Sequence, residues 1–154
     1  MNNIYGINYF FEKVLRAKPK NQRWSWGAID HRANRVFLRL WEDQIKGNSH
    51  GKAVIFWKNR SVAPHSHGYR ERAEHVQAIK NGAQGFGVIC RARDKNEKPR
   101  TIAEYEQDAL VLLTGLTEDE RAVYAQTKWI SLEELKLSSS QIKNKSRNRA
   151  AARS

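Results

Sequence analysis

The sequence predicts an α+β domain built on a curled, mostly antiparallel sheet or partial barrel with flanking helices. Residues 35–45 begin with a strict alternation of apolar and other side chains, which is the period of a half-buried strand. Residues 7–15 and 69–84 instead repeat apolar side chains at helical spacing. The predicted order is helix, two strands, helix, three strands and a short helix, which favours antiparallel pairing of the successive strands.

The first predicted element is a helix over residues 7–17. Its apolar stripe comprises Ile7, Phe10, Phe11, Val14 and Leu15. Pro19 disfavours helical backbone at the residue before it, so the helix is expected to end ahead of this proline.

Two strands are predicted next, over residues 35–45 and 52–59. One face of the first strand carries Val36, Leu38 and Leu40, and the opposite face carries Arg35, Phe37, Arg39 and Trp41. The second strand is apolar on both faces, as in a strand that is buried on both sides. The connection between them is polar and contains glycine. We therefore expect the two strands to pair as an antiparallel hairpin with a long loop.

The second half of the chain predicts a helix followed by three strands. The helix covers residues 69–84, and Gly82 is its end signal. The strands are expected at residues 85–94, 109–116 and 121–130, with a polar connection at 95–108 and a turn at 117–120. Ser131 and Glu134 have the spacing of a capping box, so a short helix is predicted to close the domain.

The charge of the chain predicts a polyanionic partner. The formal net charge is +12, and residues 136–154 contribute six of these positive charges without any acidic residue. The rest of the chain is therefore basic as well, and such a field favours nucleic acid. We predict a single nucleic-acid-binding domain over residues 1–137 and a disordered basic tail over residues 138–154, which is poor in large apolar side chains.

Composition also limits the class of protein. No apolar run approaches the roughly 20 residues that a membrane-spanning helix needs. The amino terminus places its apolar residues before its positive charges, which is the reverse of a secretory signal. The single cysteine, Cys90, lies in an apolar run and is interpreted as a small core residue. These features predict a cytoplasmic protein.

The face formed by Arg35, Phe37, Arg39 and Trp41 is the first candidate binding surface. Guanidinium groups pair with phosphate, and aromatic rings stack on bases. The alternative is a sheet covered on both sides, in which Phe37 and Trp41 are core and the arginines extend to solvent.

Trp24 and Trp26 form a second candidate, because residues two apart share a face of an extended segment. Two such rings could hold a flipped base between them. The alternative is a core plug whose indole N–H groups donate to backbone carbonyls.

Residues 65–75 supply the remaining candidates. His65, His67, Tyr69, Arg70 and Arg72 are assigned to phosphate or base contacts, since the start of a helix also favours phosphate. One alternative is a metal site or a nuclease base at the His65–His67 pair, with His75 or Glu71 as a third ligand. A magnesium nuclease built from Asp30, Glu42, Asp43 and Lys46 is a further alternative, although the spacing of these residues is wrong for it.

Four segments together resemble a known domain: 24–28, 35–45, 69–90 and 99–113. Their order is similar to a domain that precedes HNH nucleases in modification-dependent restriction systems and, more distantly, to the PUA-like superfamily with its SRA and EVE readers of modified bases. The resemblance covers about residues 7–135 and carries no invariant motif. It implies a curled sheet that presents an extruded base to aromatic rings, and no HNH module is left in this chain.

These observations predict a reader domain that binds nucleic acid, with DNA favoured over RNA and a modified or flipped base as its target. The prediction includes no catalytic residues, no metal and no cofactor, and allows a separate nuclease subunit as a partner. The alternatives are a small metal-dependent nuclease and an RNA- or ribosome-associated basic protein.

Overall fold

A seven-stranded mixed sheet forms the centre of the molecule. The computed structural model describes residues 6–20, 25–46, 52–58, 67–94, 96 and 101–135. The strands are β1 (Gly27–Asp30), β2 (Arg35–Trp41), β3 (Lys52–Trp57), β4 (Gln84–Ala92), β5 (Ile102–Tyr105), β6 (Ala109–Glu118) and β7 (Ala122–Ser131). Their order across the sheet is β1-β2-β4-β6-β7-β3, and β5 pairs with β4. The pair β2–β4 is parallel and the others are antiparallel. The predicted α+β class is confirmed.

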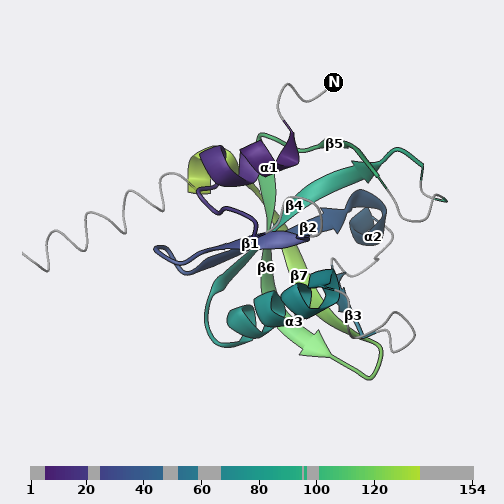
Figure 1. The fold of residues 1–154 in the computed structure, drawn as a ribbon. Coiled ribbons are helices and arrows are strands. Elements are labelled where there is room, and N and C mark those ends of the chain that lie inside the picture. Colours follow the sequence, from purple (N-terminus) through teal and green to yellow (C-terminus); the bar gives the residue numbers. More distant parts are fainter. Residues whose placement is uncertain are drawn as a thin grey trace, which may run out of the picture.

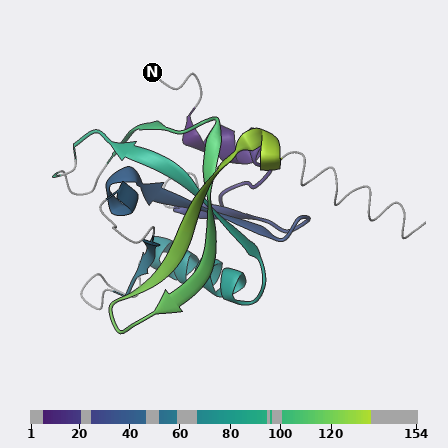
Figure 2. The same ribbon diagram turned by 180° about the vertical axis from the view of Figure 1, so that it is seen from behind.

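Helices cover the two faces of this sheet (Figures 1 and 2). On one side lie α1 (Ile7–Tyr9) and the π-helix η1 (Phe10–Val14), which continues it directly. On the other side lies α3 (His67–Lys80), while α2 (Glu42–Lys46) follows β2. The closing helical turn at residues 132–135 lies beside α1 in both views.

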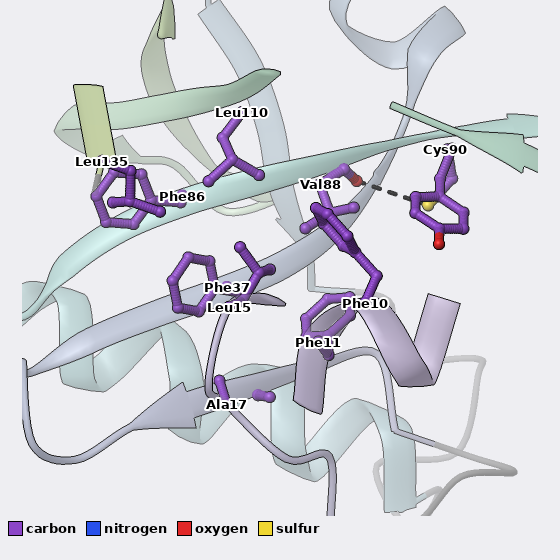
Figure 3. Packing of buried hydrophobic residues seen from close by; sticks show 12 residues of the cluster. Phe10, Phe11, Leu15, Ala17, Phe37, Phe86, Val88, Cys90, Leu110 and Leu135 are labelled. Carbon is purple, nitrogen blue, oxygen red and sulfur yellow. Dashed lines mark hydrogen bonds between the residues drawn. The ribbon is translucent and has the colours of Figure 1, made fainter. Parts of the chain in front are cut away.

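Each face of the sheet has its own hydrophobic cluster. The cluster under η1 contains Phe10, Phe11, Phe37, Phe86 and Leu135 among its buried members (Figure 3). The cluster under α3 contains Val36, Leu38 and Leu40 together with Val76 and Ile79 of the helix. The predicted alternation in β2 is thus confirmed, and both of its faces are covered.

Cys90 is a core residue, as predicted. It is 1% exposed, and its Sγ lies 3.6 Å from the carbonyl oxygen of Val88, to which it donates. Burial raises the pKa of the thiol to about 12. The thiol therefore stays protonated and unreactive at neutral pH.

Several predicted boundaries were wrong. The strand at residues 35–45 ends at Trp41, and α2 begins at Glu42. This helix directs the chain away from β2, so the predicted hairpin of the first two strands does not form. Instead β2 pairs with β1 and β4, and β3 pairs with β7. The short strands β1 and β5 were not predicted, because four residues are too few to display a period.

The sheet is open, and the prediction of a curled sheet or partial barrel was wrong. Strand β1 pairs only with the first four residues of β2, from Arg35 to Leu38, and the two ends of the strand order are β1 and β3. Where β1 no longer pairs with β2, an arginine side chain contacts the edge of β2 instead. Arg72 of α3 donates to the carbonyl oxygens of Arg39 in β2 and Ile55 in β3, at 2.6 and 3.3 Å.

Three local signals are present where the sequence predicted them. Gly82 has a φ of 114°, and the amides of Gly82 and Ala83 donate to Ile79 and Ala78, which is a Schellman motif. The predicted capping box is present, since the amide of Glu134 donates to Ser131 Oγ at 3.1 Å. The predicted turn after β6 is held by Asp119, which accepts from the amides of Arg121 and Ala122.

Within the described part of the chain, no helix is both long and apolar enough to span a membrane. The tail at residues 138–154 lies outside that part.

Candidate nucleic-acid interface

Trp26 is an exposed aromatic side chain on a fixed backbone. It is 40% exposed. Its amide donates to Glu71 Oε1 at 3.0 Å, and its carbonyl oxygen accepts from the amide of Arg39 at 2.8 Å and from Arg72 Nη2 at 3.4 Å. Both polar groups of this residue's backbone are therefore held by neighbours that lie far away in the sequence.

Two buried charged residues hold the backbone of Trp26. Glu71 and Arg72 are 3% and 7% exposed, and Ser25 is 1% exposed. Glu71 also accepts from Ser25 Oγ at 2.8 Å. Burial lowers the pKa of Arg72 to about 10, so the guanidinium remains charged at neutral pH. A buried charge is costly unless it is hydrogen-bonded, and here Glu71 and Arg72 each make one of their hydrogen bonds to the backbone of Trp26.

The indole of Trp26 lies against the start of α3. A Cβ atom at Gly68 would be 2.4 Å from Cε2 of this ring and 2.7 Å from Nε1 and Cζ2, so only glycine allows the contact. Tyr69 and Arg70 follow in the same helical turn; Arg70 is exposed and Tyr69 is half-buried. We call Trp26, Gly68, Tyr69 and Arg70 the Trp26 surface.

The arginine and aromatic face of β2 is not a free surface. Phe37 is 0% exposed and stacks on Phe86 with ring centroids 5.4 Å apart. Arg35 is 3% exposed, and its guanidinium lies over the Phe86 ring while Nε donates to Gln84 Oε1 at 3.3 Å. In the folded protein Phe37 is buried in the cluster under η1 and Arg35 is buried against Phe86, so neither side chain is exposed for contact with a base or a phosphate.

Arg39 and Trp41 lie on the same face and are half-buried. Arg39 Nη2 donates to Asn8 Oδ1 at 2.6 Å, and the guanidinium lies 5.8 Å from the centroid of the Phe11 ring. Burial lowers the pKa of Arg39 from its usual value. Trp41 packs against the cluster under η1. Both side chains contribute mainly to packing.

The other predicted site residues are divided between the Trp26 surface, the core and the undescribed segments. Arg72 is buried, and its guanidinium donates to backbone carbonyls, so this side chain is not exposed for direct contact with nucleic acid. Tyr69 packs its ring on Phe56, with centroids 4.9 Å apart. Trp24 and His65 lie outside the described residues, and of His67 only the backbone is described.

The acids considered for a nuclease have other contacts. Asp30 accepts from the amide of Arg32 and caps the turn between β1 and β2. Glu42 accepts from Arg91, which also bonds Glu104 and Glu106 and so ties α2 to β4 and β5. In the described ranges, no three His, Cys, Asp or Glu side chains are grouped so that they could hold a metal ion.

His75 is a buried titratable group of α3 close to this network. It is 3% exposed, and among the described residues its Nδ1 has no hydrogen-bond partner. Burial, with the positive charges of Arg72 and Lys20, lowers its pKa to about 4. The histidine is thus neutral in the folded protein at neutral pH.

Acid is therefore expected to destabilise the fold through His75. The unfolded chain binds a proton near pH 6.5 and the folded chain only near pH 4, so stability is lost as the pH falls through this window. The loss should reach about 3 kcal/mol below pH 4. Urea unfolding of the wild type and of His75→Gln between pH 7 and 4 measures it. The exposed His31→Gln is the control, and equal pH dependence in wild type and His75→Gln would contradict the assignment.

Sequence reasoning did not find Ser25 or Gly68, and it considered Glu71 only as a metal ligand. No local pattern marks them, because their roles depend on the approach of α3 to the segment before β1. Comparisons with protein-family models, with curated proteins and with solved structures find no significant match for this chain.

Proposed function

We propose that this protein binds nucleic acid, with DNA favoured over RNA, through the Trp26 surface. The observation that carries the proposal is an indole that is 40% exposed while its backbone is held by the buried side chains of Glu71 and Arg72. Because its backbone is fixed before binding, only the side chain of Trp26 loses conformational entropy when a base stacks on the ring.

The charge of the chain supports the same proposal. The formal net charge of +12 attracts phosphate, and phosphate neutralisation provides most of the non-specific affinity of nucleic-acid-binding proteins. Within the Trp26 surface, Arg70 is exposed on α3. This cation would neutralise a phosphate next to a base held at Trp26.

A finer proposal comes from the sequence resemblance to PUA-like readers. It is that the bound base is a modified or extruded one and that a separate nuclease subunit supplies cleavage. The binding proposal does not depend on this finer one, since it rests on Trp26 and on charge.

Trp26→Ala is expected to weaken binding to a fluorescein-labelled DNA oligonucleotide by about 1–3 kcal/mol, because it removes the stacking ring. Fluorescence anisotropy at fixed salt measures the change in Kd. Trp129→Ala is the matched control, since Trp129 is 51% exposed on β7. Affinity should also fall steeply with salt. The absence of measurable binding to DNA and RNA at low salt would contradict the proposal.

A further inference from the structure

Within the described part of the chain, the Trp26 surface offers one exposed ring to a ligand. Among the described residues, the exposed large apolar side chains are Tyr9, Val14, Trp26, Trp57 and Trp129, and only Trp26 belongs to this surface. Tyr69 is half-buried and its ring is engaged by Phe56. Among these residues, the aromatic contribution to binding at this surface is therefore that of one indole.

The free energy gained by stacking one base on one ring does not exceed the free energy needed to unpair that base in a duplex. Stacking of one base on one aromatic side chain strengthens binding by about 5- to 150-fold. Extrusion of a paired base costs a comparable or larger factor, because the base must be unstacked and unpaired. An unpaired base carries little of this penalty, so the indole adds its full effect only when the base is already free.

We infer that the ligand of the Trp26 surface is an unpaired base, so that the protein prefers a single strand to a duplex, and that Gly68 and Glu71 are the residues that position the ring for it. This inference rests on the proposed function. Gly68 provides the space for the indole edge, and Glu71 fixes the amide of Trp26.

Charge alone predicts the opposite preference. A duplex has a higher density of phosphates than a single strand and releases more counterions when a cationic protein binds it. With a net charge of +12, a protein without a stacking site should therefore bind the duplex more tightly. A single-strand preference consequently reports on the ring and not on the charge.

The test compares a fluorescein-labelled single strand of about 12 nucleotides, within the range of single-strand site sizes, with the blunt duplex of the same sequence. Kd is measured by anisotropy at matched salt for the wild type, Gly68→Ala and Gly6→Ala. Gly6 is the matched control because a Cβ atom there meets nothing within 4 Å. We expect the wild type and Gly6→Ala to bind the single strand more tightly than the duplex. In Gly68→Ala the ratio of the two Kd values should shift toward the duplex by at least about 5-fold, which removes the preference.

Two further variants separate positioning from general damage to the fold. Glu71→Gln keeps an acceptor for the amide of Trp26 and should retain the preference, whereas Glu71→Ala should lose it at unchanged salt dependence. Should Gly68→Ala fail to fold in a thermal melt, Trp26→Ala provides the same comparison. Equal affinity for both probes, or a preference that survives in Gly68→Ala and Trp26→Ala, overturns the inference and leaves nucleic-acid binding intact. Failure of both probes to bind overturns the proposed function as well.

Discussion

Replacement of Phe37 by alanine is expected to destabilise the protein by about 3–5 kcal/mol. Phe37 is 0% exposed and stacks on Phe86 in the cluster under η1 (Figure 3). Removal of the ring leaves a cavity among close-packed neighbours that can collapse only in part. The midpoint of urea unfolding should fall without a change in slope.

Trp26→Ala is the informative control for this measurement. An exposed ring contributes little to the folded state, so the loss of stability should stay below about 1 kcal/mol. The two variants should therefore differ in what they change: Phe37→Ala lowers the free energy of unfolding, and Trp26→Ala lowers the affinity for nucleic acid. A Phe37→Ala protein of unchanged stability would show that the β2 face is not packed under η1.

Arg72→Met is expected to cost about 3–5 kcal/mol of stability, because it removes the positive charge that offsets buried Glu71 and the guanidinium donor to the carbonyls of Arg39 and Ile55. The guanidinium of Arg72 donates to the carbonyl oxygens of Ile55, Trp26 and Arg39. It also interacts favourably with the charge of Glu71. Methionine retains much of the apolar stem, so the loss measures the hydrogen bonds and the charge.

Arg70→Met is the matched control for this variant. Arg70 precedes Arg72 by two residues in α3 but is exposed, so its replacement should change stability by less than about 0.5 kcal/mol. Arg72→Lys should not restore stability fully, because an ammonium cannot reproduce the planar array of guanidinium donors. Urea unfolding of the three variants measures these differences. Equal stability of Arg72→Met and wild type would contradict the role given to Arg72 at the sheet edges.

Local chemistry was sufficient to predict the elements with a strong period or a terminal signal. The alternation of residues 35–41 predicted both faces of β2, and the helical spacing before Gly82 predicted the course and the end of α3. Such patterns are visible because backbone geometry alone sets the periods of strand and helix. The short strands β1 and β5 have no comparable pattern, since their pairing partners lie elsewhere in the chain.

The candidate site also contains features that local sequence predicts and features that it does not. Trp26 and Phe37 both stood out as aromatic residues beside arginines, yet one is 40% and the other 0% exposed. No local rule separates them, because exposure depends on what packs against each ring. Here η1 covers Phe37, and Gly68 of α3 supports the edge of Trp26.

The sequence by itself determined the basic charge, the α+β class, the two faces of β2 and the burial of Cys90, since each follows from composition or from the period of a single segment. Only the tertiary structure decided that both faces of β2 are covered, that the sheet remains open and that Arg72 bonds both of its edges. It also decided that Glu71 holds the backbone of Trp26. These features join residues more than 15 positions apart, and the free energy that selects them comes from packing and from the pairing of buried charges, which no single stretch of sequence contains.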